Sequence, residues 1–239
     1  MEKTDPFAAT IPAPTATRPL LGLTVLVIED SRFACEAMRL LCLRSGARIR
    51  RADCLRSARR HLQVYRPSVV IVDLGLPDGN GVDLIAELTQ TEPRVDVLLG
   101  TSGDLDGETQ ALAAGADGFL EKPITSLAAF QQAVLSNLPA DRQPSGLRRL
   151  PDEVIHPDRM AFQDDMAHIA DVLEDPADDQ ALDYVAQFLG GVARSAQDDV
   201  LEKAAKALAK RRAAGEPAST ETAKIAGLIQ ERLTQKLAI

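Results

Sequence analysis

Aliphatic runs alternate with segments of helical periodicity along the first part of the chain. Residues 23–28 form a continuous run of β-branched and aliphatic residues that ends at Glu29 and Asp30, which is typical of a strand buried on both faces. Apolar side chains then recur every three or four residues between positions 33 and 43, and Gly46 follows as a stop signal. The opening unit is therefore predicted to be a strand followed by a helix.

The same alternation continues to about residue 138. The pattern predicts further strands near residue 49 and at 69–72, 95–99 and 118–121, and further helices at 55–64, 82–89, 107–114 and 126–138. Because parallel neighbours in a sheet need crossover connections, the order favours an α/β fold, a five-stranded doubly wound parallel sheet. Functional residues in such sheets gather at the carboxyl ends of the strands.

The second half of the chain carries a different pattern. Prolines, a glycine and charged residues interrupt residues 139–158, which are predicted to be a linker. Beyond them, helix-period segments at 160–173, 180–196, 198–213 and 219–237 predict a smaller all-α domain over residues 159–239. Residues 1–20 are rich in Pro, Ala and Thr without periodicity, so a disordered tail is expected before a domain spanning residues 22–138.

Chemically distinctive residues stand where the predicted strands end: Glu29 and Asp30, Asp73, Thr101, and Lys122. Carboxylates gathered at one sheet edge raise one another's pKa unless a cation is bound, and Mg²⁺ prefers such oxygen ligands. A hydroxyl and an ammonium group suit the oxygens of a phosphoryl group. The set therefore predicts phosphoryl transfer, with Asp73 as the nucleophile that forms an aspartyl phosphate.

Four sequence segments carry a family resemblance: Glu29-Asp30, residues 73–81 (Asp-Leu-Gly-Leu-Pro-Asp-Gly-Asn-Gly), Thr101-Ser102, and residues 115–123 (Gly-Ala-Asp-Gly-Phe-Leu-Glu-Lys-Pro). Residues 22–138 resemble the flavodoxin-like receiver domain of two-component response regulators. The resemblance implies that Asp73 takes a phosphoryl group from a histidine kinase or phosphotransfer protein. The protein is then a self-directed phosphoacceptor and not an enzyme.

The resemblance also implies individual roles. Asp30 and Asp73 would bind Mg²⁺ directly, Glu29 through water and Gly75 by its backbone carbonyl group. Lys122 would contact the phosphoryl group, and the Lys122-Pro123 peptide bond is expected to be cis. The switch pair would be Thr101, whose hydroxyl moves to the phosphoryl group, and Phe119, whose ring turns into the space that the hydroxyl leaves.

Two positions depart from the family pattern. Gly100 stands where a bulky aliphatic residue is usual, so Ser102 is an alternative switch residue to the favoured Thr101. Gly75, two residues after Asp73, offers no side chain over the phosphoryl group. We therefore expect water to reach that group freely, with its lifetime set elsewhere.

Composition narrows the class of protein. The net charge of -8 makes DNA an unlikely main partner, although a helix with basic residues between Lys203 and Arg212 could form a local patch. Three cysteines without metal-ligand spacing, and no signal peptide, fit a reducing cytoplasm. No apolar run reaches the roughly 20 residues that span a bilayer, so no membrane association is expected.

The function of the helical half stays open among three hypotheses. In the first, it binds an unknown output protein or forms a homodimer. The apolar stripe of Ile225, Leu228, Ile229, Leu233 and Leu237 would serve either the core of a helical bundle or a coiled-coil-like dimer seam. In the second, the helix from Lys203 to Arg212 binds DNA in a transcriptional regulator. In the third, His168 is a phosphorelay site, although Asp171, Glu174 and Asp175 follow it.

Overall fold

The computed structural model describes residues 13–146, 148–174 and 179–235. Its main sheet has five parallel strands in the order β2-β1-β3-β6-β7. They are β1 (Thr24–Ile28), β2 (Arg48–Ala52), β3 (Val69–Asp73), β6 (Val97–Ser102) and β7 (Gly118–Glu121). The predicted fold class is confirmed. One predicted strand, 95–99, begins and ends later than expected, because its pairing with β3 runs from Val97 to Thr101.

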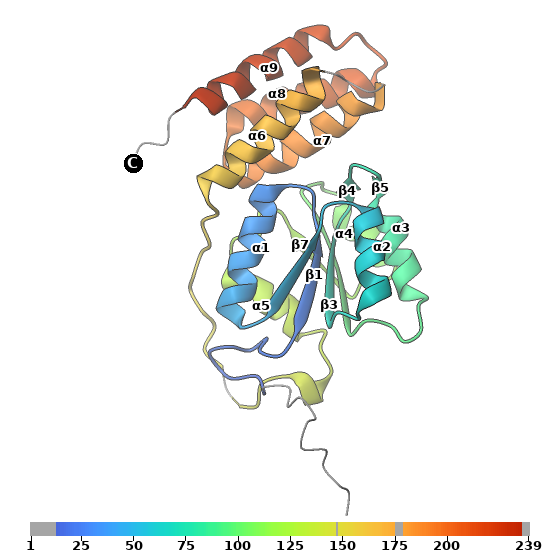
Figure 1. Ribbon diagram of the computed structural model, residues 1–239, viewed down its shortest axis with the longest axis vertical. Coiled ribbons are helices and arrows are strands. Elements are labelled where there is room, and N and C mark those ends of the chain that lie inside the picture. Colours follow the sequence, from blue (N-terminus) through green and yellow to red (C-terminus); the bar gives the residue numbers. More distant parts are fainter. Residues whose placement is uncertain (1–12, 147, 175–178, 236–239) are drawn as a thin grey trace, which may run out of the picture.

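Helices cover both faces of this sheet (Figure 1). On one face lie α1 (Arg32–Ser45) and α5 (Leu127–Leu135), and on the other lie α2 (Leu55–Val64), α3 (Gly81–Thr89) and α4 (Gly107–Ala113). Alternate strand residues face the two layers: Ile71 packs with α1 and α5, whereas Val72 packs with the other three helices. Burial on both faces explains the aliphatic runs in the sequence.

A small hairpin separates β3 from α3. It pairs the two-residue strands β4 (Gly75–Leu76) and β5 (Gly79–Asn80), which the sequence pattern did not predict. The Asp78 carboxylate in its turn accepts hydrogen bonds from the backbone amides of Leu55 and Arg56, and so caps α2. The hairpin thereby fixes the loop that follows Asp73.

The segments that flank the sheet domain are partly ordered against it. Residues 1–12 of the expected tail lie outside the described part of the chain, but its last residue, Leu20, is fully buried in the α1–α5 layer. The expected linker contains a short 3-10 helix, η1 (Ala140–Arg142), and then Val154 forms a β-bridge to Ser126. Ile155 is also buried in that layer. This connection therefore runs along the domain surface.

The second domain consists of α6 (Arg159–Glu174), α7 (Asp179–Ser195), α8 (Asp199–Ala213) and α9 (Ser219–Thr234). It has a separate apolar core, which includes Met166, Leu189 and Leu208. Ile225 and Ile229 of the predicted apolar stripe are buried in this core, while Leu237 lies outside the described residues. The described residues of the stripe thus pack in the core of the bundle itself. Across the described residues, no helix is long and apolar enough to cross a membrane.

The helical domain sits on the sheet domain at the carboxyl ends of the strands (Figure 1). Helices α6 and α7 both pack on α1. The ring of Phe33 meets that of Phe162 edge to face, with ring centroids 5.8 Å apart, and Arg32 forms an ion pair with Asp164. The edge at which the predicted site residues gather is therefore shared between the two domains.

Candidate functional site

Three carboxylates gather at this edge. Glu29 and Asp30 follow β1 and Asp73 ends β3, neighbouring strands in the sheet. Each can offer one oxygen such that all three oxygens lie within 4.8 Å of one another. Glu29 and Asp73 are buried and Asp30 is partly exposed. The structure therefore brings together the acidic residues that the strand ends predicted.

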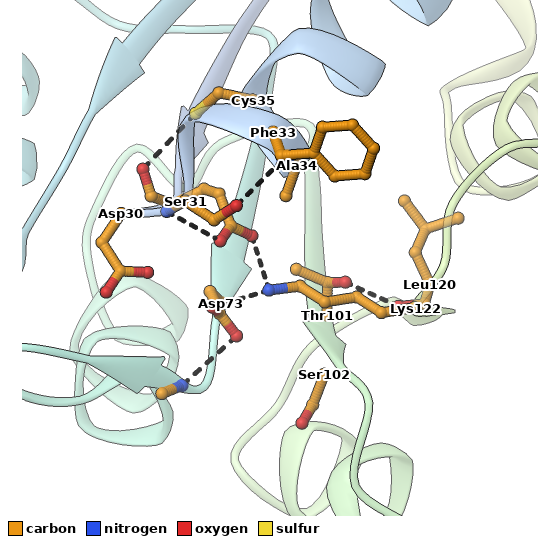
Figure 2. A network of polar contacts seen from close by, with 12 residues as sticks. Asp30, Ser31, Phe33, Ala34, Cys35, Asp73, Thr101, Ser102, Leu120 and Lys122 are labelled. Carbon is orange, nitrogen blue, oxygen red and sulfur yellow. Dashed lines mark hydrogen bonds and ion pairs between the residues drawn. The ribbon is translucent and has the colours of Figure 1, made fainter. Parts of the chain in front are cut away.

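Lys122, which directly follows β7, reaches the carboxylates with its side chain (Figure 2). Its ammonium nitrogen lies 2.7 Å from Asp73 Oδ2 and 2.7 Å from Glu29 Oε2. Burial alone would lower the pKa of Lys122, but the charges of Asp73 and Glu29 raise it above its ordinary value. The ammonium group therefore stays charged. The Lys122-Pro123 bond is cis, as expected.

The cluster holds more negative than positive charge. Burial, followed by the charge of Asp73, raises the pKa of Glu29 well above its usual range and that of Asp30 to about 7. A divalent cation would supply the missing positive charge, and carboxylate oxygens are the ligands that Mg²⁺ prefers. The donor set therefore fits Mg²⁺. The Gly75 amide donates to Asp73 Oδ1 at 3.3 Å, while the ligand role of the Gly75 carbonyl stays a prediction.

The two candidate switch hydroxyls point in different directions (Figure 2). Thr101 pairs with Asp73 across β6 and β3, is buried, and donates from Oγ1 to the Leu120 carbonyl oxygen at 2.7 Å. Ser102 is one residue further on, where its Oγ accepts from the Asp104 amide. Residues paired in register share a sheet face, so Thr101 is the hydroxyl on the Asp73 side.

The unusual Gly100 has a packing explanation. A Cβ atom there would lie 2.5 Å from the Ala111 Cβ and 3.3 Å from the Phe119 ring. Phe119 is half-buried against the layer of α2, α3 and α4, and its ring would also come within 3.1 Å of a Cβ at Gly107. The two glycines therefore make room for the Phe119 ring, while the switch roles of Thr101 and Phe119 stay predictions.

The helical domain adds contacts that sequence reasoning missed. The Tyr184 hydroxyl of α7 donates to Asp30 Oδ2 at 2.9 Å. Burial, with the nearby Asp30 charge, raises the pKa of Tyr184 above its ordinary value, so the hydroxyl keeps its proton. Further along α7, the Arg194 guanidinium donates to the Gly103 carbonyl in the loop after β6. Helix α7 therefore touches the loops on both sides of Asp73.

Asp165 of α6 binds the start of α1. Its carboxylate accepts hydrogen bonds from Ser31 Oγ at 2.7 Å, the Arg32 amide at 2.7 Å and the Phe33 amide at 3.1 Å. Amides in the first turn of a helix have no partner within the helix, and an acid there is favoured by the helix dipole. Asp165 thereby caps a helix of the other domain, next to Glu29 and Asp30.

The space over Gly75, which was expected to be open, is filled by Gln187 of α7. A Cβ atom added to Gly75 would overlap the Gln187 carboxamide and lie 2.6 Å from its Cδ. Both residues line a cleft of about 510 Å³ between the two domains, together with Asp73 and Lys122. The Gln187 carboxamide therefore lies where a side chain at position 75 would be, while free access of water to the phosphoryl group stays a prediction.

Comparison with known proteins identifies the first domain. Residues 25–134 match the family model of the response regulator receiver domain. The chain is 30% identical over 133 residues to the KDP operon transcriptional regulatory protein KdpE of Escherichia coli, covering 55% of this chain and 59% of that protein. It is 31% identical over 128 residues to the virulence transcriptional regulatory protein PhoP of Salmonella typhimurium, covering 52% and 54%. The chain thus spans little more than half the length of these relatives.

Solved structures of receiver domains are similar to about half of the chain. The beryllofluoride-activated NtrC4 receiver domain dimer is 27% identical, with a TM-score of 0.44, covering 48% of this chain and 95% of that one. The receiver domain of the sensor histidine kinase PA1611 from Pseudomonas aeruginosa, which has a magnesium ion in its active site cleft, is 22% identical, with a TM-score of 0.44, covering 48% and 95%. Residues 25–134 of this chain are a response regulator receiver domain, followed by a four-helix domain that lies outside the matched region.

Proposed function

We propose that this protein is a two-component response regulator that accepts a phosphoryl group on Asp73 from a histidine kinase or a phosphotransfer protein. The observation that carries the proposal is the position of Asp73, with one oxygen on the Lys122 ammonium and the other on the Gly75 amide. An oxygen of Asp73 attacks phosphorus, and the bond from phosphorus to the donor breaks. The protein itself is modified, so it is a phosphoacceptor and not an enzyme.

The surrounding residues neutralise and orient the phosphoryl group. Lys122 faces its oxygens, and Thr101 donates to it after leaving the Leu120 carbonyl, which frees space for the Phe119 ring. Mg²⁺, held by Glu29, Asp30, Asp73 and the Gly75 carbonyl, would neutralise further charge on the phosphoryl oxygens. We expect this chemistry in the cytoplasm, in line with three cysteines that form no disulfide.

The helical domain is the proposed output. Because Tyr184 binds Asp30 and Arg194 binds the loop after β6, a phosphoryl group on Asp73 changes the surface on which α7 rests. Phosphorylation would thereby weaken the contact between the domains and expose a face of α6 and α7. That face would bind an output protein or a second copy of the chain.

Labelling by acetyl phosphate tests the proposal. With Mg²⁺ present, the wild type should gain one phosphoryl group per chain, whereas Asp73→Ala should gain none. Asp141→Ala, at an exposed aspartate in η1, is the matched control and should label normally. Light scattering on the same samples reports dimerisation. No label on the wild type at any Mg²⁺ concentration would refute the phosphoacceptor proposal.

A transcriptional regulator is the second candidate, because KdpE and PhoP are named as such. The basic helix α8 is its best DNA-binding surface. However, Lys206 pairs with Glu202, and Arg211 pairs with Glu216 and Glu221, so acids neutralise part of that surface. DNA retention that falls steeply with salt, and is lost when Lys203 and Lys210 become Ala, would favour this candidate.

Phosphorelay through His168 is the third candidate. Its ring nitrogen Nε2 lies 3.1 Å from the Tyr184 hydroxyl, which places the histidine near the Asp30 side of the site. A second phosphoryl label that is stable to base, labile to acid and lost in His168→Gln would favour this role. If the label is labile to base and unchanged in His168→Gln, the histidine does not take part.

A further inference from the structure

The geometry points to Gln187 as a positioning residue for the hydrolysis of phosphorylated Asp73. This inference rests on the proposed function, because it concerns the lifetime of the phosphoryl group. It assigns to the helical domain a direct part in ending the signal. The side chain that the receiver domain lacks at Gly75 is supplied by α7.

A hydrogen bond links Asp73 to Gly75. The Gly75 amide donates to Asp73 Oδ1, so the α-carbon of Gly75 lies at the rim of the phosphoacceptor site. A side chain on that carbon would enter the cleft that Asp73 and Lys122 also line. The volume it would occupy holds the Gln187 carboxamide, with Cδ 2.6 Å and Oε1 3.2 Å from the position of a Cβ atom.

Helix α7 is fixed on the receiver domain by two contacts. Tyr184, three residues before Gln187, binds Asp30, and Arg194, seven residues after it, binds the Gly103 carbonyl. Spacings of three and seven put these side chains on one helix face. These contacts hold the part of α7 that carries Gln187 against the site.

The cleft has open space next to the Gln187 carboxamide. Gly190 and Gly191 of α7 line the same cleft as Asp73 and Lys122, and a Cβ atom on either glycine would meet nothing within 4 Å. The open volume next to Gln187 has room for a phosphoryl group and a water molecule.

The chemistry suits a carboxamide. Water oxygen attacks phosphorus in line with the bond to the Asp73 oxygen, that bond breaks, Asp73 leaves as a carboxylate, and the proton of the water passes to phosphate or solvent. A glutamine can accept one hydrogen bond from the water and donate another to a phosphoryl oxygen, as glutamines that orient water do in other phosphoryl transfers. Gln187 acts in this way only while α7 is docked.

The test measures loss of label from Asp73 after removal of acetyl phosphate, at constant Mg²⁺. Gln187→Ala and Gln187→Leu should each slow hydrolysis by on the order of tenfold to a hundredfold. Gln230→Ala, an exposed glutamine on α9, is the matched control and should not. Adding Gly75→Asn to Gln187→Ala returns a carboxamide to the same volume and should restore part of the rate.

The leucine variant separates positioning from filling of space. A wild-type rate in Gln187→Leu would overturn the inference, and so would faster hydrolysis in Gln187→Ala, since Gln187 would then be a shield against water. Both results need a labelled protein. Failure of the wild type to label would instead refute the proposed function, so the two failures are distinguishable.

Discussion

Lys122 brings a positive charge into direct contact with Glu29 and Asp73. Its side chain is 8% exposed and lies 2.7 Å from each partner. A buried ion pair gains little over an apolar pair, but removal of one partner leaves the other charge without compensation. The stability of this edge of the sheet therefore depends on a cation, either the lysine or a metal ion.

Lys122→Ala should lower the free energy of unfolding by about 3 kcal/mol when no divalent ion is present. Mg²⁺ should restore part of that loss, because it brings positive charge to the same carboxylates. Urea denaturation with and without Mg²⁺ measures both effects. Lys203→Ala, at an exposed position on α8, is the control. An equal loss in the two variants would contradict the assignment.

Several single residues could be predicted from the sequence, whereas others could not. Asp73, Lys122 and Thr101 were found because each stands where a strand ends, and parallel strands bring those ends together. Asp165, Tyr184 and Gln187 had no such signal. Each acts on a residue more than a hundred positions away in the chain, across a contact between domains that periodicity does not encode.

Within the elements, Asp198 joins two helices of the second domain. Its carboxylate accepts from the Leu201 amide, which caps α8, and from the Arg232 guanidinium of α9 at 2.7 Å. The hydrogen bond from Arg232 lowers the pKa of Asp198 below its usual value. A depressed pKa adds stability above the unfolded-state pKa of about 3.9, and this stability is lost as the pH falls through the folded-state value.

Asp198→Asn should therefore destabilise the protein by about 1 kcal/mol at neutral pH, because asparagine keeps the cap but loses the charge. The difference between the variant and the wild type should shrink once the pH falls below the folded-state pKa. Urea denaturation across this range measures it. A difference that stays constant with pH would show that the charge of Asp198 is not involved.

The ends of a helix could be predicted where the capping residue is its neighbour in the sequence. Gly46 ends α1 with a positive φ of 86°, and Ser31 caps its start through the Ala34 amide. The β4–β5 hairpin escaped prediction because two-residue strands carry no periodicity. The apolar stripe of α9 left bundle core and dimer seam equally open, and burial of Ile225 and Ile229 assigns those two residues to the core.

At the scale of the whole molecule, one domain covers the reactive edge of the other. Contacts from α6 hold α1, and contacts from α7 hold the loops around Asp73. The arrangement leaves a cleft for small molecules, while a large partner would have to displace α7. Separation of the domains is therefore the movement expected on activation.

Beryllofluoride with Mg²⁺, a mimic of the phosphoryl group, should increase the radius of gyration in small-angle X-ray scattering. Asp165→Ala should shift the protein toward the extended form even without the mimic, because it removes three hydrogen bonds between the domains. Asp171→Ala, at an exposed site on α6, should not. An unchanged radius in all samples would mean that the domains stay docked during signalling.

The cap that Asp165 places on α1 also has a consequence for synthesis of the chain. Arg32 and Phe33 are synthesised long before residue 165, so α1 first forms with only the Ser31 cap. Domains generally fold as units, the N-terminal one first. The nascent receiver domain therefore exposes its acidic edge to solvent until α6 and α7 have been translated and have packed against it.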